Sequence, residues 1–475
     1  MHFLTRLGVF LLKHFPLTNI SEVIGVRPAV DADYIANVRK WREAWNGKMS
    51  HNIGKKGEEG IPSLQLAKRA STLVANNVAV GLESEVQGQG IDAFNTDFQK
   101  AVNNVRDCVE AVCATHQIIW RPDFDVESGK VVVVTSEAGT YLPLRYNRLG
   151  EMVAVVFIEQ QKKGDDWYTL LTKCDFIDNR YTIENKAYKG ELSRRGAEIP
   201  LTSIDAWKDL SPYEEHAASR PWFVELTAPN NEAVFDRALD LIKEADIQES
   251  RLSWENEAGE PMVFASGDLF KDVGKKSAAN PKQSETKLDI PKNKKRLFNV
   301  GNYSPSESKI HLHNPELRNE SLDYRKNDIK REIEDILGFP RGSLSKAEIA
   351  TKTATEVIDG KSNFAVLVET LRERLTVALD SLAVVMFEVG TAAKLYNGKF
   401  EIATQYGDFL LTPEQRMAKF REEWATILSG VAQGVVSLIE ARAWYKENSE
   451  TFFKLSKEAL KKAEEEMPES LPSEF

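Results

Sequence analysis

The chain has 475 residues, with 62 Lys and Arg against 72 Asp and Glu, a net charge of -10 at pH 7 and an isoelectric point of about 5.5. Its 42% of hydrophobic and 28% of charged residues are typical of a globular protein and exclude an intrinsically disordered chain. The length exceeds what one hydrophobic core usually covers, so we expect two or more domains. The acidity disfavours a nucleic-acid-binding protein with a basic surface. It leaves open a protein that lets nucleic acid pass without holding it.

Residues Met1–Phe15 form an apolar and basic segment. It is too short and too interrupted by charge to span a bilayer, and no small-residue cleavage site of a signal peptide follows it. We expect it to dock on its own protein as an amphipathic segment. We expect no other stretch of membrane-spanning length.

Three helices are predicted next. Aromatic and aliphatic residues recur at three- and four-residue steps over residues 31–46. A loop rich in Gly, Lys and Glu follows at Gly47–Gly60. Pro62 predicts the start of the second helix. The third helical stretch runs from about Phe94 to Ile118.

After the third predicted helix, the sequence changes to runs of β-branched and aromatic residues divided by Asn, Gly and Asp turns. This pattern predicts an antiparallel meander. Asp123, Asp125 and Glu127 superficially resemble a calcium-binding loop, but the central Gly that such a loop requires is missing. We therefore predict a hairpin turn there. The predicted strands are Lys130–Thr135, Tyr141–Tyr146, Glu151–Gln160, Trp167–Phe176 and Tyr181–Tyr188.

A polar insertion separates two predicted helices in the middle of the chain. Residues Pro229–Trp254 keep one face apolar, and a second helix runs from Pro315 to its C-cap at Gly338. A short strand is predicted at Pro261–Phe264. The segment Lys271–Arg296 holds nine basic and three acidic residues, a local charge of +6. It is either a solvated insertion or a docking surface for an acidic partner or for DNA phosphates. The flanking helices predict an antiparallel pair that carries the insertion at its far end.

The last third of the chain contains the longest periodic stretch. Pro340 breaks the preceding helix, and Leu344–Gly360 predicts a loop leading into another helix. Lys361–Tyr396 then predicts one long helix. A strand-like segment at Phe400–Tyr406 and a helical module from Thr412 complete the chain. On the long helix, three apolar residues serve either the core or an interface between subunits: Phe364, Leu367 and Leu371.

No usual catalytic motif is present in the sequence, so we expect no enzyme, no cofactor and no metal. Gly274-Lys275-Lys276-Ser277 lacks the partner glycine of a phosphate-binding loop, because Leu269 occupies that place. His311 and His313 share one face of a strand and are either exposed strand residues or the beginning of a metal site. Three cysteines argue against a disulfide scaffold and predict reduced, structural thiols. They are Cys108, Cys113 and Cys174; the first two do not share a helix face, and with His116 they lack the converging ligands of a metal site.

Several local strings, in this order, resemble the portal proteins of tailed bacteriophages, specifically the SPP1/A118-like group of phages of Gram-positive hosts. The strings span nearly the whole chain. They are Val38-Arg39-Lys40-Trp41 through Trp45, Pro62-Ser63-Leu64-Gln65-Leu66-Ala67-Lys68, Leu142-Pro143-Leu144-Arg145-Tyr146-Asn147, Ala233-Val234-Phe235-Asp236 through Asp246-Ile247, Asn314-Pro315-Glu316-Leu317-Arg318 and Lys352-Thr353-Ala354-Thr355-Glu356-Val357.

The resemblance implies an α+β, portal-like fold with a mixed wing, two antiparallel stem helices that carry a small α/β clip, a long wing helix and a helical crown. The implied boundaries are residues 1–228 for the wing, 229–257 and 313–337 for the stem helices, 258–312 for the clip, 338–360 for the tunnel loop, 361–411 for the long wing helix and strand, and 412–475 for the crown.

The same resemblance implies a ring of about twelve subunits at one capsid vertex, through which double-stranded DNA is packaged and ejected. The implied partners are other copies of the chain, DNA, the terminase large subunit, a head–tail adaptor, and the major capsid and scaffolding proteins, with no membrane. The implied location is the virion, and the host cytoplasm during assembly. The implied site residues are Ser345, Lys346, Thr351 and Lys352 in the tunnel loop, Lys292, Lys294, Lys295 and Arg296 for docking on the clip, and Arg318 and Arg325 on the stem.

Two alternatives remain at this point. One is another minor head or scaffold-associated protein of the virion, which differs from a portal mainly in stoichiometry. The other is an enzyme with an unrecognised site, for example one built on the predicted meander.

Overall fold

The structure is a computed structural model. It describes residues 25–30, 32–54, 60–125, 128–190, 197–259, 262–265, 297–299, 310–313, 316–346, 362–407, 409, 413–437, 440–442 and 444–445. These residues contain both helices and β-sheets and fall into two compact units. The first holds the described residues up to Ala403 except Ala79–Glu83, and the second holds Ala79–Glu83 and the described residues from Thr404.

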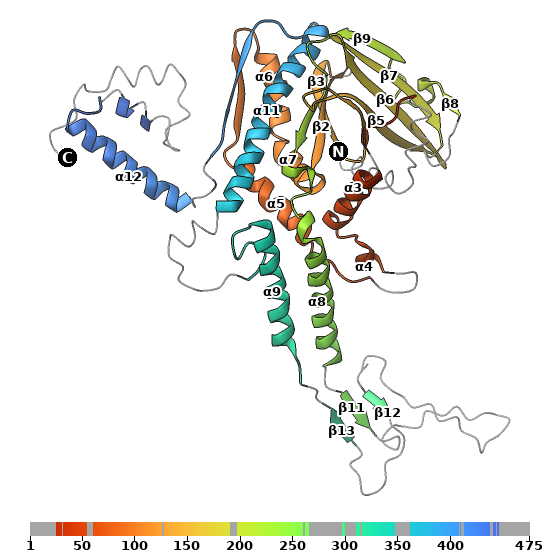
Figure 1. The fold of residues 1–475 in the computed structure, drawn as a ribbon, viewed down its shortest axis with the longest axis vertical. Coiled ribbons are helices and arrows are strands. Elements are labelled where there is room, and N and C mark those ends of the chain that lie inside the picture. The colour runs from red at the N-terminus through yellow and green to blue at the C-terminus, as the bar shows by residue number, and fades with distance from the viewer. Residues whose placement is uncertain are drawn as a thin grey trace. The chain divides into compact units, whose positions relative to one another are not determined.

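Helices dominate the N-terminal part of the first unit (Figure 1). The helix expected from Pro62 begins four residues later, because Gln65 adopts a left-handed backbone with φ of 53°. The stretch expected as one helix to Ile118 is two helices, which part at Asn103 and Asn104 and end at the left-handed His116. The helices are α3 (Ala32–Trp45), α4 (Ser50–Ile53), α5 (Leu66–Val78), α6 (Asp92–Val102) and α7 (Val105–Thr115).

The predicted meander is confirmed for its last four strands, β4 to β7, which lie side by side in this order in a six-stranded sheet. The sheet is completed by β8 and β9, which both pair with β7. The run from Lys130 belongs to another sheet, ordered β10-β2-β3, whose strand β2 was not predicted. The strands are β2 (Gln117–Asp125), β3 (Lys130–Glu137), β4 (Tyr141–Tyr146), β5 (Met152–Lys163), β6 (Asp166–Ile177), β7 (Arg180–Lys189), β8 (Glu198–Ile199), β9 (Tyr213–Ala217) and β10 (Val224–Thr227).

The hairpin expected near Asp125 is present and joins β2 to β3. Asp125 lies opposite Lys130 in the ladder. Its side chain accepts a hydrogen bond from the Ser128 amide at 3.2 Å, and its carbonyl accepts one from Gly129 at 2.8 Å. The carboxylate at this position therefore stabilises the turn.

Strand β5 is central to the core of the β4–β8 sheet. Its alternate residues Ala154, Val156 and Ile158 are buried in one cluster with residues of β4 and β6, and Phe157 is buried on the other face. Trp207 closes a second cluster against Leu170 and Ala187. The sheet is therefore covered on both faces, which explains the nearly continuous apolar run of β5.

The long helix expected near the C-terminal third is α11 (Ser362–Ala392). It packs against β2, β10 and α5, and its residues Val368, Leu375 and Leu379 are fully buried. By length and composition alone this helix would be able to cross a membrane, contrary to our expectation. Half of its apolar window is buried inside the fold, as in the core helix of a globular protein. Phe364 and Leu371 are buried too and Leu367 is half-buried, so these residues serve the core.

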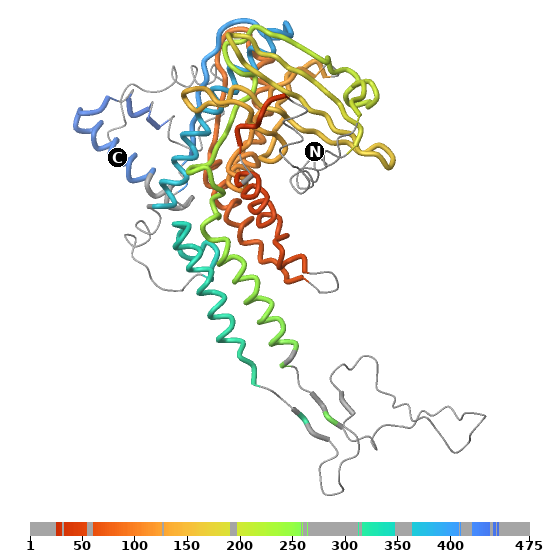
Figure 2. Tube along the Cα trace, turned by 45° about the vertical axis from the view of Figure 1, so that its right-hand side comes forward, coloured from red at the N-terminus to blue at the C-terminus, as the bar shows by residue number. Residues whose placement is uncertain are grey.

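The two helices that flank the insertion are α8 (Leu239–Ala258) and α9 (Asn319–Leu337), which lie side by side in both views (Figures 1 and 2). The predicted start of the first at Pro229 is wrong, because residues 229–231 and 236–238 form two short 3-10 turns, η2 and η3. Gly338 ends α9 with φ of 68°, as predicted. The strands between them are β11 (Met262–Ala265), β12 (Leu297–Asn299) and β13 (Ile310–His313), in the order β12-β11-β13.

The remaining strands, β1 (Glu83–Gly88) and β14 (Phe400–Gln405), form a two-stranded sheet, and the remaining short turn is η1 (Leu201–Ser203). The second unit contains α12 (Pro413–Ala432), and four of its aromatic rings lie close together. Trp424 lies 4.6 Å from Tyr445 and stacks on Trp444, which also stacks on Phe420.

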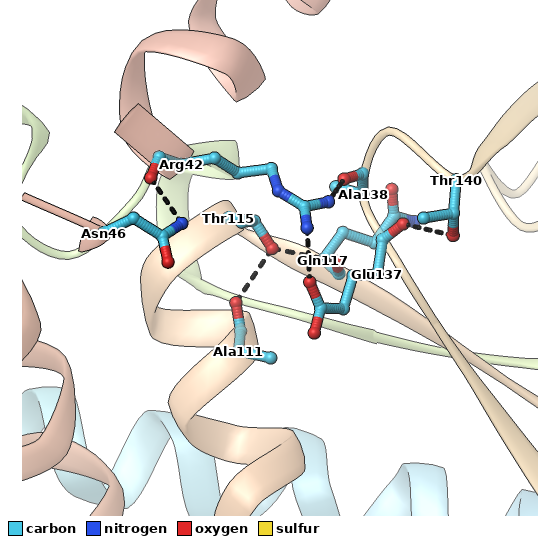
Figure 3. A network of polar contacts seen from close by, with 8 residues as sticks. All are labelled: Arg42, Asn46, Ala111, Thr115, Gln117, Glu137, Ala138 and Thr140. Carbon is cyan, nitrogen blue, oxygen red and sulfur yellow. Dashed lines mark hydrogen bonds and ion pairs between the residues drawn. The ribbon is translucent and has the colours of Figure 1, made fainter. Parts of the chain in front are cut away.

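A buried arginine fastens α3 to the corner between β3 and β4 (Figure 3). Arg42 donates to the carbonyl of Ala138 at 3.0 Å and pairs with Glu137 at 2.9 Å. Burial lowers the pKa of Arg42, and the Glu137 charge opposes this. Thr115 ends α7 in the same region by donating to Ala111. This polar network fixes the helical layer against the sheet.

His116 is a buried imidazole between two aromatic rings. Its ring lies 5.6 Å from that of Tyr34 and 5.9 Å from that of Trp41, both edge-on, and neither ring nitrogen has a hydrogen-bond partner among the residues that the structure describes. Burial lowers the pKa of His116 from 6.5 to about 4. The fold therefore requires the neutral imidazole.

We expect acid to destabilise the fold through His116. The unfolded chain takes up the proton below pH 6.5 whereas the folded chain resists it until about pH 4, so stability is full above pH 6.5 and falls by about 3 kcal/mol as the pH reaches 4. The variant His116→Asn keeps a residue that tolerates the left-handed backbone and cannot titrate. Denaturant unfolding at pH 4.5 and 7.5 should show a smaller pH dependence for this variant. Equal pH dependence in both proteins would contradict the assignment.

Candidate functional site on the α8–α9 helix pair

The α8–α9 pair combines a narrow apolar seam with ion pairs along its edges. Ile329 and Ile333 of α9 are fully buried, and so is Ala245 of α8. Arg318, just before α9, binds Glu255 with both ends of its guanidinium, at 3.1 and 2.9 Å. These hydrogen bonds lower the pKa of Glu255. The end of the pair next to the inserted sheet is therefore held together by the ion pair between Arg318 and Glu255.

Two further cations of α9 are held by carboxylates. Arg325 binds Glu244 of α8 at 3.1 Å and, on its own helix, Asp328 and Glu332 at 2.9 Å each. The bond to Glu332 and its other partners raise the pKa of Arg325. Lys326 binds Glu249 of α8 at 2.8 Å and Asp323 at 3.1 Å. The positive charges at the seam are thus neutralised within the pair.

The pair as a whole is acidic. Helices α8 and α9 together contain twelve Asp and Glu against six Lys and Arg, a net charge of -6. Lys330 is half-buried, and burial together with the nearby Lys326 and Arg69 lowers its pKa. An array of carboxylates with its seam cations already paired repels nucleic-acid phosphates more than it attracts them.

A buried carboxylate on α8 positions the segment around α4. Asp246 is completely buried. One of its oxygens lies 3.0 Å from both His51 Nε2 and the Asn52 side-chain amide, and the other accepts a hydrogen bond from the Leu64 backbone amide at 2.7 Å. The segment expected as a loop at Gly47–Gly60 therefore contains a short helix, α4, and this helix and the nearby Leu64 dock on α8.

A second buried carboxylate, Glu334 of α9, holds the chain that follows the helix. Its side chain is fully buried and accepts four hydrogen bonds. The donors are the amides of Leu344 at 2.6 Å, Ser345 at 2.7 Å and Gly342 at 3.2 Å, and the Ser345 hydroxyl at 2.9 Å. A carboxylate without counter-charge is stable in the interior when its lone pairs are filled in this way. Glu334 therefore fixes residues 342–345 against α9.

The turn before this segment is fixed by packing. Phe339 is buried and its ring lies 5.4 Å from that of Phe364 on α11, edge-on. Arg341 forms an exposed ion pair with Asp335 at 2.5 Å. The chain thus leaves α9 along a defined path up to Lys346, the last residue of the described range 316–346.

The site residues expected from the sequence fall into two groups. Ser345 is held by Glu334, and the exposed Lys346 ammonium pairs with Asp323 while its amide donates to Asn327 at 2.7 Å. Arg318 and Arg325 form the ion pairs described above. The others lie outside the described residues, and these are Thr351, Lys352, Lys292, Lys294, Lys295 and Arg296. The Met1–Phe15 segment lies outside them as well.

Candidate chemistry elsewhere is limited in the described part of the chain. No group of three His, Cys, Asp or Glu side chains there is arranged to hold a metal ion. The three cysteines are free and buried, and burial raises the pKa of each thiol, that of Cys174 to about 11. These thiols are protonated at neutral pH and are poor nucleophiles.

Sequence reasoning missed Asp246 and Glu334, which organise this site. Both are acids at helix positions flanked by buried apolar residues, such as Ala245 and Ile333. That signal was present in the sequence. The partners of Asp246 were beyond reach, since they lie 182 to 195 positions away, whereas those of Glu334 lie 8 to 11 positions further along the chain.

Comparison with known proteins gives a weak structural likeness. No protein-family model matches the chain, and no curated protein sequence is significantly similar. A solved structure described as "Virion of native gene transfer agent (GTA) particle" is similar with a TM-score of 0.41 and 11% identity over 90% of this chain and 98% of that chain. "Neck of native GTA particle computed with C12 symmetry" gives 0.41 and 12% over 90% and 97%, and "Neck of empty GTA particle computed with C6 symmetry" gives 0.38 and 12% over 80% and 89%. At these TM-scores the likeness carries no argument about function.

We expect Glu334→Gln to release residues 342–345 from α9. The amide side chain offers one acceptor oxygen where four donors converge, so about 2 kcal/mol is lost locally. Hydrogen exchange of the Gly342, Leu344 and Ser345 amides should accelerate at least tenfold. The matched control is Glu320→Gln, which removes an exposed acid at the other end of α9. Equal exchange in Glu334→Gln and wild type would show that the carboxylate does not hold this segment.

Proposed function

We propose that this chain is the subunit of a phage portal ring, a structural protein without catalytic activity through which double-stranded DNA enters and leaves a capsid. The proposal rests on the sequence resemblance and on one structural observation. That observation is the antiparallel, acidic helix pair α8–α9, which carries a separate small sheet between its two helices. The pair is followed by residues 342–345, which Glu334 fixes against α9. In the proposed portal, the pair is the stem, the β12-β11-β13 sheet belongs to the clip, and α11 is the long wing helix.

The chemistry of the pair suits a surface that DNA must slide past. Each phosphate that a protein neutralises adds salt-dependent affinity, and a polymer held at many such points stalls. On α8–α9, Arg325 and Lys326 are neutralised within the protein before DNA arrives. The carboxylate excess then keeps the contacts weak and independent of base sequence. Lys346 contributes less to DNA contact than a free lysine, because Asp323 is its partner.

Residues 342–345, which Glu334 fixes, define where the chain leaves the proposed stem. In the proposed ring, residues 338–346 lead from α9 toward the narrowest part of the channel. Glu334 and Phe339 hold this exit in a fixed position relative to α9 and α11. Tight anchoring makes the position of this exit reproducible in every subunit. The terminase, head–tail adaptor, capsid and scaffolding partners belong to the same proposal.

The first test is assembly. We expect the purified full-length chain to form closed rings of about twelve subunits around a central hole, seen by negative-stain electron microscopy and counted by native mass spectrometry. A heterologous interface that closes gives one sharp oligomer mass. A monomer or a dimer throughout the micromolar range would contradict the proposal.

The second test concerns the neutralised cations. The triple variant Glu244→Gln, Glu249→Gln and Glu332→Gln removes three partners of Arg325 and Lys326 and changes the net charge by +3. We expect rings of this variant to bind linear double-stranded DNA about tenfold more tightly at 50 mM salt, with a log–log salt slope steeper by about 1 to 2.

The matched control has the same charge change on the body. It is Asp166→Asn, Glu184→Gln and Glu215→Gln, which breaks three exposed ion pairs of β6, β7 and β9. Its DNA affinity should change less than that of the stem variant. A larger effect of the body set would show that DNA does not pass along α8–α9.

A further inference from the structure

Lys330 is a cation of α9 that the helix pair does not neutralise. Arg325 and Lys326 on the same helix are each held by carboxylates, whereas Lys330 forms no ion pair with the residues that the structure describes. Its side chain is half-buried, and burial together with the charges of Lys326 and Arg69 lowers the pKa of Lys330. The fold therefore places this ammonium beside other cations.

The contacts of the pair fix the height and the side at which Lys330 lies. Lys326 of α9 binds Glu249 of α8. In the antiparallel pair, Lys330 lies about 6 Å further along from this contact and Asp246 about 4.5 Å in the same direction, at 1.5 Å per residue. Residues three or four apart share a helix face, so Lys330 and Asp246 lie on the same side of the pair as well. They are thus neighbours in height and in direction.

Helix α5 brings a second cation to the same place. Asp246 binds the backbone amide of Leu64, and Arg69 follows five residues later in the first turn of α5, which packs against α8 (Figure 1). Arg69 is exposed and, among the described residues, forms no ion pair. Its effect on the pKa of Lys330 agrees with this placement. We call Arg69 and Lys330 the α5–α9 cation cluster.

Two acids border the cluster, and lysines already bind both of them. Glu249 pairs with Lys326, and Asp323 pairs with Lys326 and Lys346. These two lysines offset these two acids, so both charges of the cluster remain unmatched. Bringing like charges together opposes folding, and groups perturbed in this way gather at functional sites. The cluster therefore fits an anion that comes from outside the subunit.

We propose that the α5–α9 cation cluster binds a phosphate of the DNA backbone, at one point in each subunit of the ring. A phosphodiester carries one negative charge and accepts charge-assisted hydrogen bonds from an ammonium and a guanidinium together. The inference rests on the proposed portal function and names the point at which its channel contacts DNA.

The position of the cluster suits such a contact. Asp246 and the ion pairs of the seam fix α5, α8 and α9 against one another, so the two cations need no rearrangement to meet a phosphate. Lys330 lies one helical turn before Glu334, which holds residues 342–345 where the chain leaves α9. A single contact at this level, next to a pair that is otherwise acidic, guides the duplex without holding it along the whole pair.

The test measures the binding of linear double-stranded DNA to purified rings of the full-length chain. We expect the double variant Arg69→Gln and Lys330→Gln to bind about tenfold more weakly at about 50 mM salt, with a log–log salt slope shallower by about 1 to 2. Lys330→Arg keeps the charge and should bind as wild type does. The matched control is Arg148→Gln with Lys208→Gln, which removes the same two charge types from exposed body positions and should leave the affinity unchanged.

A second measurement separates phosphate binding from a role in the fold. Because Lys330 is half-buried and close to Arg69, Lys330→Gln relieves repulsion, so the melting temperature of the ring should stay the same or rise. A lower melting temperature with unchanged DNA affinity would show that the lysine stabilises the subunit and does not serve DNA.

Inorganic phosphate distinguishes the DNA backbone from a free phosphate ion. At constant ionic strength, phosphate should raise the melting temperature of wild type no more than that of the double variant. A larger rise for wild type would assign the cluster to a free phosphate and overturn its assignment to DNA.

Three further outcomes contradict the inference. If the double variant forms rings that bind DNA as wild type does, the cluster is not a DNA contact, while the portal function stands. If the folded double variant no longer forms rings, the cluster contacts a neighbouring copy instead of DNA. If wild type forms no rings at all, the portal function fails and this inference with it.

Discussion

Two buried carboxylates, Asp246 and Glu334, are the interactions on which the candidate site depends. Each lies on one helix of the α8–α9 pair and collects hydrogen bonds from a loop that would otherwise have unpaired backbone amides. An ionised carboxylate in the interior is costly unless its lone pairs are filled, and the amides of a loop are equally costly when buried alone. Each group therefore requires the other. The helix pair and the two loops at its base are positioned as one unit for this reason.

The sequence predicts elements better than it predicts their ends. The helical period of α11 and the apolar run of β5 follow from burial, and burial is visible in the local spacing of apolar residues along the sequence. The ends depend on single backbone states and distant partners. Helix α5 starts at Leu66 rather than near Pro62 because Gln65 is left-handed and Leu64 is bound to Asp246. Strand β2 was hidden because α7 ends at His116, a residue that does not ordinarily stop a helix.

The candidate site was less accessible to sequence reasoning than the fold. Lysines and arginines were selected as DNA or partner contacts because they are charged, yet Lys346, Arg318 and Arg325 each have carboxylate partners in the folded chain. Charge type is visible in a sequence, whereas neutralisation depends on which side chains meet across the seam. Asp328, three residues after Arg325, follows the helical spacing rule, whereas Glu244 lies 81 residues away and no spacing rule selects it in advance.

The distribution of charge on α8–α9 follows from the pairing of its seam. The two helices carry twelve acidic and six basic residues, and Arg325 and Lys326 are each held by at least two carboxylates. In the proposed portal, a surface that faces DNA must not offer free cations, because every phosphate that a protein neutralises adds salt-dependent affinity. The carboxylates that join the two helices therefore also remove the positive charges that would hold DNA. The same ion pairs thus serve the stability of the pair and the proposed function.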